Sequence, residues 1–332
     1  MAARRRGKKK SGRSYAWRYR GRIVACVFVE VIIICALVIM IGWNKGVKEW
    51  FEQFEQPVLK EVDISGINSP NAILMQARGG KILGEINGEA QIYPASMTKI
   101  MTVILGIENF DDLDEKITLT NEMFSGLYEQ DATQAGFQPG EEVRVIDLLY
   151  GAMLPSGAEC CIALADTISG SEADFAELMN KKAGKLGMEN THFCDSTGLH
   201  NPDHYSTVKD IAVLMKYCIK NDTFREIVET SRHSTGVTNI HPDGITYYST
   251  MFKNLSDPTV TGGKILGGKT GYTSEAGHCL VSFAEIEGRE YIFVSAGASG
   301  ADGNTIPHIQ DAVTVYNRVG AAGEAKMNDN NK

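Results

Sequence analysis

Residues 94–100, with the sequence PASMTKI, place a serine and a lysine three positions apart. At that spacing both side chains leave the same face of a helix, one turn apart. A serine hydroxyl becomes a good nucleophile when a neighbouring group accepts its proton, and burial lowers the pKa of a lysine so that its amine can do so. Backbone N–H groups at a helix N-terminus also favour developing negative charge. Ser96 and Lys99 are therefore a candidate nucleophile and general base, on a helix expected to be buried through Ile100, Met101, Val103, Ile104 and Ile107.

Two later segments, Ser156-Gly157-Ala158 and Lys269-Thr270-Gly271, give this pair a context. A serine and a lysine at this spacing occur by chance in many surface helices, whereas the three segments in this order resemble the active site of penicillin-binding proteins and serine β-lactamases. The flanking sequences GGKTGYTSEAGHCLVSFA, LGMENTHFCDSTGLHNPDHYST and YPASMTKIMT are similar to those of the low-molecular-weight D-alanyl-D-alanine carboxypeptidases, the S11 family of serine peptidases. The resemblance covers residues 65–318.

This resemblance implies a covalent mechanism. Ser96 would attack the carbonyl of the penultimate D-alanine of a peptidoglycan stem peptide, with Lys99 as its general base. Ser156 would pass a proton towards the leaving amine. Lys269 would supply a positive charge, and Thr270 a hydroxyl, for the terminal carboxylate of the substrate.

The same resemblance assigns backbone roles. Gly271 would let a strand edge approach the ligand, because it has no side chain. The backbone N–H groups of Ser96 and Tyr272 would hold the oxyanion. It implies β-lactams as inhibitors and neither a cofactor nor a metal ion.

Two departures from the family pattern affect these expectations. Ala158 stands where the family usually has asparagine, whose amide would orient Lys99 and bind the substrate backbone; the adjacent Glu159 cannot donate a hydrogen bond when ionised. Only 63 residues follow Lys269, enough to complete the catalytic fold, whereas family members commonly carry a further β-rich domain and a C-terminal amphipathic anchor. We therefore expect an N-terminal segment to provide the anchor.

That anchor is predicted at residues 23–43, an apolar run of 21 residues whose one ionisable group is Glu30. As a helix it would be about 31 Å long, close to the hydrocarbon thickness of a bilayer. Residues 1–22 carry ten Arg or Lys and no acid, which predicts a cytoplasmic tail. A cleaved signal peptide is the alternative, although no convincing cleavage site follows.

We therefore expect a single-pass membrane protein with its catalytic domain outside the cytoplasm. Its parts are the basic tail (1–22), the transmembrane anchor (23–43), a linker (44–69), the catalytic domain (70–319) and a polar tail (320–332). Residues 23–332 hold 23 basic and 41 acidic side chains, a net charge of −18 that phosphate would repel, so no nucleic-acid partner is expected.

The fold class expected is α+β, with an antiparallel sheet flanked by helices as in β-lactamases and penicillin-binding proteins. Strands are predicted at 72–77, 82–86, 264–266, 279–286 and 291–296. Helices are predicted to begin at residue 96 and to span 145–153, 159–168, 173–186 and 306–319. A further helix is predicted to follow a Ser206-Thr207 cap, with Asp210 as the capping-box partner, and to end at residue 217. Residues 231–262 are predicted to be rich in loops.

Several alternatives remain open at this stage. A serine β-lactamase of class A would need a glutamate-activated water, and no Glu-x-x-Leu-Asn segment lies between Ser156 and Lys269. A penicillin-binding but catalytically weak scaffold would explain Ala158.

His200, Asp203 and His204 have a spacing seen in metal sites, but Pro202 interrupts any helix there. The cysteines show no C-x-x-C pair and are expected to be mainly buried free thiols.

Overall fold

The computed structural model describes residues 61–255, 257–300 and 306–330. The predicted tail 1–22, the predicted anchor 23–43 and residues 44–60 of the predicted linker lie outside these ranges. Among the residues described, no helix combines the length and apolar character needed to cross a membrane.

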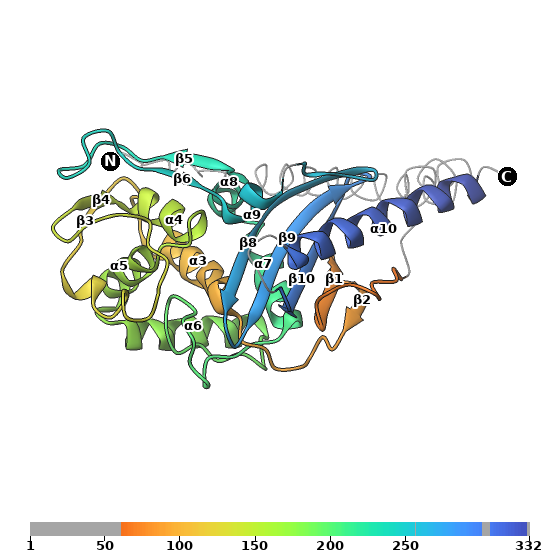
Figure 1. Ribbon diagram of the computed structural model, residues 1–332, viewed down its shortest axis with the longest axis horizontal. Coiled ribbons are helices and arrows are strands. Elements are labelled where there is room, and N and C mark those ends of the chain that lie inside the picture. The colour runs from red at the N-terminus through yellow and green to blue at the C-terminus, as the bar shows by residue number, and fades with distance from the viewer. Residues whose placement is uncertain (1–60, 256, 301–305, 331–332) are drawn as a thin grey trace, which may run out of the picture. The chain divides into compact units, whose positions relative to one another are not determined.

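A six-stranded sheet in the order β2-β1-β10-β9-β8-β7 is the central layer of the described region (Figure 1). All neighbouring strands are antiparallel. The hairpin β1–β2 from the beginning of the domain pairs with β10 from its end, so the sheet joins the two ends of the domain as predicted. The strands are β1 (Asn71–Gln76), β2 (Ile82–Ile86), β7 (Thr259–Val260), β8 (Gly263–Thr273), β9 (Gly277–Ile286) and β10 (Arg289–Ala298).

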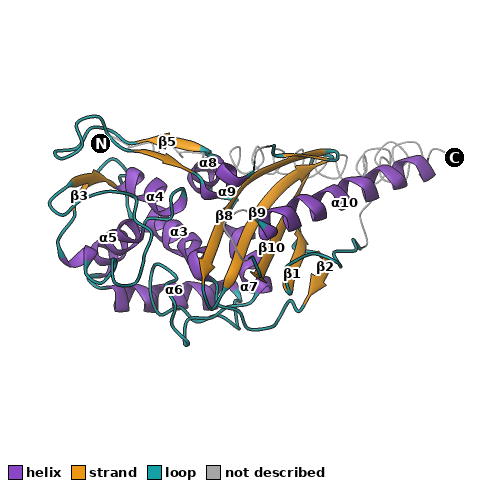
Figure 2. Ribbon diagram, in the orientation of Figure 1, coloured by secondary structure: helices purple, strands orange, loops and turns teal. Residues whose placement is uncertain are grey.

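Alternating side chains of these strands enter two separate apolar cores. On β1, Ala72 and Leu74 belong to the core that packs against α10 (Pro307–Asn330), whereas Ile73 and Met75 belong to the larger core beneath the other helices. This is the period of two that a strand buried on both faces produces. Figure 2 shows α10 along one side of the sheet and the helical cluster on the other. The α+β class predicted from the sequence is confirmed.

Helix α3 (Lys99–Asn109) is the centre of the helical cluster, and its first eight residues are all buried. It packs against helices α4 to α8. Being surrounded on all sides, it is apolar around most of its circumference. Its neighbours are α4 (Val145–Met153), α5 (Ala158–Ser169), α6 (Glu172–Leu186), α7 (Val208–Cys218) and α8 (Asp222–Glu229).

The structure differs from the sequence prediction in several segments. The loop-rich region 231–262 contains a small hairpin, β5 (Arg232–Ser234) with β6 (Thr246–Tyr248), and the short helix α9 (Thr250–Asn254). A second small sheet pairs β3 (Lys116–Thr118) with β4 (Glu142–Arg144), in agreement with the short strands that the sequence predicts within residues 117–145. The closing helix α10 continues to Asn330, through most of the segment predicted as a polar tail.

The predicted capping box at α7 is only half formed. Thr207 accepts a hydrogen bond from the Asp210 backbone N–H at 3.0 Å, as an N-cap residue should. The Asp210 carboxylate does not return the contact: it accepts hydrogen bonds from Asn190 N and Thr191 Oγ1. The side chain therefore ties the segment between α6 and α7 to the start of α7. The five cysteines in the described ranges are free, and four of them are buried.

Candidate active site

Ser96 lies in a 3₁₀ turn, η1 (Ala95–Thr98), that leads directly into α3. The Lys99 ammonium, at the first position of α3, donates to Ser96 Oγ at 3.0 Å and to the carbonyl oxygen of Thr197 at 2.6 Å. Lys99 is 4% exposed, whereas Ser96 is only partly buried. The structure thus joins the predicted nucleophile to the predicted base.

Burial lowers the pKa of Lys99, because removing the amine from water penalises its charged form. Nearby Cys161, Asp195 and Glu159 act in the opposite direction. The net lowering increases the fraction of neutral amine, which is the form that can accept a proton from Ser96. The amine already lies at hydrogen-bonding distance from the hydroxyl it would deprotonate.

Ser156 and Lys269 form the second pair. Lys269 Nζ donates to Ser156 Oγ at 3.0 Å and to the carbonyl of Thr270 at 2.9 Å. Ser156 has a φ of +74°, a left-handed conformation that costs free energy for a residue with a side chain. This conformation holds the hydroxyl between α4 and α5, where Lys269 reaches it from β8. Three segments that are far apart in the sequence therefore meet at one place.

The charge state of Lys269 qualifies one expectation. Burial, and then the neighbouring Lys99, lower the pKa of Lys269 well below its ordinary value. Lys269 therefore loses its proton more readily than an ordinary lysine, which weakens the expectation of a permanent positive charge. A carboxylate bound beside Lys269 would favour the charged amine, because an opposite charge raises a lysine pKa.

Gly271 is required by a contact within the protein. A Cβ at this position would lie 3.0 Å from Ser96 N and 3.1 Å from the Cβ of Ala95. The strand β8 therefore lies directly against η1, and a side chain would push the two apart. Thr270 Oγ1 lies 2.7 Å from Thr250 Oγ1 on α9, and Tyr272 is 59% exposed beside the His278 ring.

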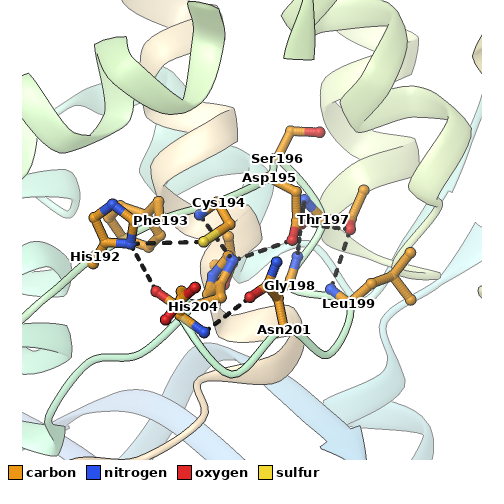
Figure 3. Close-up of polar contacts among 12 residues, drawn as sticks. His192, Phe193, Cys194, Asp195, Ser196, Thr197, Gly198, Leu199, Asn201 and His204 are labelled. Carbon is orange, nitrogen blue, oxygen red and sulfur yellow. Dashed lines mark hydrogen bonds and ion pairs between the residues drawn. The ribbon is translucent and has the colours of Figure 1, made fainter. Parts of the chain in front are cut away.

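The Thr197 carbonyl belongs to a turn formed by residues 195–198. Asp195 Oδ1 accepts from Thr197 N, Thr197 Oγ1 and Gly198 N at 2.7–2.8 Å. Asp195 Oδ2 lies 3.1 Å from His204 Nδ1 (Figure 3). An aspartate followed three residues later by a glycine is a recognisable turn pattern, and this pattern could have indicated the turn from the sequence.

His204 connects this turn back to the nucleophile segment. Its Nε2 lies 2.8 Å from Thr98 Oγ1, and the ring is 2% exposed. Thr98 therefore has a polar partner although it is buried. His200 instead lies 3.9 Å from Glu275, so the two histidines take part in separate contacts and do not form the metal pair that their spacing allowed.

Ala158 begins α5 and is buried. Glu159 is also buried, and its Oε1 accepts from the backbone N–H groups of Ala135 and Gly136 at 2.6 and 2.9 Å. Its carboxylate therefore anchors the loop over Gly157 and makes no hydrogen bond to Lys99. Lys99 is oriented here by its hydrogen bond to the Thr197 carbonyl oxygen.

These features have counterparts in known proteins. The family model described as "Peptidase_S11: D-alanyl-D-alanine carboxypeptidase" matches residues 58–300. The carboxypeptidase DacF of Bacillus subtilis is 35% identical over 231 residues, which are 69% of this chain and 57% of DacF. DacC of Escherichia coli is 33% identical over 262 residues, 71% of this chain and 58% of DacC. The chain thus spans less than two thirds of the length of these two relatives.

Solved structures show the same fold. The Streptomyces K15 DD-transpeptidase has a TM-score of 0.67 and 28% identity, with 80% of this chain and all of that protein covered. A D-alanyl-D-alanine carboxypeptidase from Mycobacterium tuberculosis has a TM-score of 0.68 at 22% identity, a likeness that concerns the fold alone.

The Asp195 contacts predict a pH-dependent contribution to stability. Burial alone would raise the pKa of this carboxyl, but hydrogen bonds from His204, Thr197 and Gly198 lower it from 3.8 to about 2. The ionised group therefore contributes roughly 2 kcal/mol of stability above pH 4, which is lost as the pH falls towards 2. Urea unfolding should show Asp195→Asn less stable than wild type by about this amount at pH 7, with the difference shrinking below pH 4.

Asp203→Asn is the matched control, because Asp203 is an exposed carboxylate in the same loop. It should change the free energy of unfolding by less than about 0.5 kcal/mol. A difference between wild type and Asp195→Asn that stays constant from pH 7 to pH 3 would contradict the assigned ionisation.

Proposed function

The chain belongs to the D-alanyl-D-alanine carboxypeptidase family of serine peptidases, and we propose that it removes the terminal D-alanine from peptidoglycan pentapeptide stems through an acyl-enzyme on Ser96. The observation that carries this proposal is the contact of the buried Lys99 amine with Ser96 Oγ. It places a nucleophile within reach of a base whose pKa is lowered by burial.

In the acylation step, Ser96 Oγ attacks the carbonyl carbon of the penultimate D-alanine while its proton passes to Lys99 Nζ. The bond to the terminal D-alanine nitrogen breaks, and that nitrogen takes up a proton from Lys99 with Ser156 as the relay. A water molecule then attacks the ester and gives its proton to Lys99, and Ser96 recovers its hydrogen. The products are free D-alanine and the shortened peptide.

Substrate orientation would come from the β8 side of the site. The terminal carboxylate would lie near Lys269 and the Thr270 hydroxyl, and its charge would favour the protonated form of Lys269. Backbone N–H groups of Ser96 and Tyr272 would stabilise the oxyanion. A ligand without this carboxylate would lose the charge pair, which favours a carboxypeptidase over an endopeptidase.

The test combines labelling with product analysis on the full-length protein. Wild type should bind a fluorescent penicillin covalently and release D-alanine from a pentapeptide ending in D-Ala-D-Ala. Ser96→Ala should lose both activities by several orders of magnitude, because the nucleophile is absent. Ser125→Ala, which removes an exposed serine hydroxyl, should retain both.

The other outcomes separate the alternatives. Covalent labelling without D-alanine release would favour a scaffold or, if an added amine captures the acyl group, a transpeptidase. Rapid turnover of penicillin would favour a β-lactamase. Labelling that persists in Ser96→Ala would contradict the proposed nucleophile.

We also propose that residues 23–43 anchor the protein in the cell membrane, with the catalytic domain outside the cytoplasm. The support is the apolar run of 21 residues that follows ten basic residues. The full chain should pellet with membranes and require detergent for extraction, whereas a chain lacking residues 1–43 should not. Protease added to intact spheroplasts should digest the catalytic domain; protection of that domain would contradict the orientation.

A further inference from the structure

We infer that Asp195 is a positioning residue for the general base, acting through the turn 195–198 and through His204 to hold Lys99 against Ser96. This inference rests on the proposed function, since it assigns a role within the same acylation step. It adds to the site a carboxylate that touches neither the nucleophile nor the base directly.

The Lys99 amine donates to two acceptors. One is Ser96 Oγ, the atom that reacts, and the other is the Thr197 carbonyl at 2.6 Å. Only the second can stay fixed while Ser96 forms and breaks bonds. The position of the amine relative to the nucleophile therefore depends on where the Thr197 peptide lies.

Asp195 determines the position of that peptide. Its Oδ1 accepts the N–H groups on both sides of the Thr197 carbonyl carbon, those of Thr197 and Gly198, together with the Thr197 hydroxyl. Three donors on one carboxylate oxygen leave the turn little freedom to rotate its carbonyl. Gly198 adds a steric limit, because a Cβ there would lie 1.9 Å from the Ala95 carbonyl oxygen.

The carboxylate is itself fixed from the nucleophile side. Its Oδ2 meets His204 Nδ1 at 3.1 Å, and His204 Nε2 meets Thr98 Oγ1 at 2.8 Å. Thr98 is the residue before Lys99, so the contacts form a closed ring from Thr98 through His204, Asp195 and Thr197 back to Lys99. Such a ring transmits a displacement of Asp195 to the amine, and displacements of about 1 Å can cost a hundredfold in rate.

A separate set of contacts keeps the turn docked when Asp195 is changed. Ser196 N and Oγ both donate to Glu172, and the Ser196 carbonyl accepts from Thr102 Oγ1 on α3 at 2.6 Å. These bonds do not involve Asp195. Asp195→Asn should therefore alter the placement of the Thr197 carbonyl without releasing the segment from the domain.

Electrostatics give this role a signature that a purely structural residue would not have. Four charged or titratable groups favour the protonated form of Lys99: Cys161, Asp195, Glu159 and Cys160. The positive charge of the neighbouring Lys269 has the opposite effect, because the two amines repel each other when both are protonated. Removing the Asp195 charge lowers the pKa of Lys99 further. The acid limb of the acylation rate then moves to lower pH, although the plateau rate falls because the amine is misplaced.

The experiment measures acylation of the full-length protein by a fluorescent penicillin between pH 5 and pH 10, with the reversible binding step and the covalent step resolved by stopped flow. We expect Asp195→Asn to lower the plateau of the covalent rate constant between about ten- and a hundredfold, with reversible binding nearly unchanged. The midpoint of its acid limb should lie at lower pH than in wild type. Asp203→Asn is the matched charge control and should behave as wild type.

A pair of variants at Thr98 tests the route through His204. Thr98→Val removes the hydroxyl that meets His204 and should lower the covalent rate constant, as Asp195→Asn does. Thr98→Ser keeps the hydroxyl and should retain most of the wild-type rate constant.

A wild-type pH profile and plateau in Asp195→Asn would overturn the inference, as would a loss confined to reversible binding. Equal rates in Thr98→Val and Thr98→Ser would overturn the part that runs through His204. If wild type itself takes up no label, the proposed function fails; if wild type reacts and Asp195→Asn reacts equally, only this inference fails.

Discussion

The burial of the Lys99 amine beside Ser96 is the constraint on which the rest of the site depends. An ammonium taken out of water is costly unless it is paired or loses its proton, and here its two acceptors are a hydroxyl and a carbonyl, neither of which is charged. Burial therefore lowers the pKa of Lys99 and increases the fraction of amine that can accept a proton. The helix α3 makes this possible because it is enclosed by five other helices.

Close approach of backbones explains the small residues around the site. The strand β8 passes η1 so closely that a Cβ at position 271 would lie 3.0 Å from Ser96 N, and a Cβ at Gly198 would lie closer still to Ala95, at 1.9 Å from its carbonyl oxygen. Ser156 takes a left-handed conformation at the junction of α4 and α5, where its hydroxyl accepts a hydrogen bond from Lys269. The sheet and the helical cluster are thereby held in one geometry at the point where their polar residues meet.

The sequence was most informative where pattern and chemistry coincide. Helix α4 has the predicted bounds, the hairpin β1–β2 and its pairing to the C-terminal strands were predicted, and the segments containing Ser96, Lys99, Ser156 and Lys269 do meet. The Asp195–His204–Thr98 contacts were not predicted, because nothing in spacing reveals that residues 98 and 204 lie side by side. The lowered pKa of Lys269 was also missed, since it depends on burial and on the neighbouring amine. Helix α8 (Asp222–Glu229) was not predicted, because eight residues give too short an apolar pattern to identify a helix.

The protonation state of Lys99 tests the central claim most directly. A titration of the lysine side-chain resonances of the full-length protein by NMR, with the Lys99 signal assigned from its loss in Lys99→Arg, would report this pKa. The account predicts a midpoint below 10.5, the ordinary lysine value, because burial outweighs the nearby negative groups. A midpoint at or above 10.5 would mean that the amine stays charged beside Ser96, and it would contradict Lys99 as the general base.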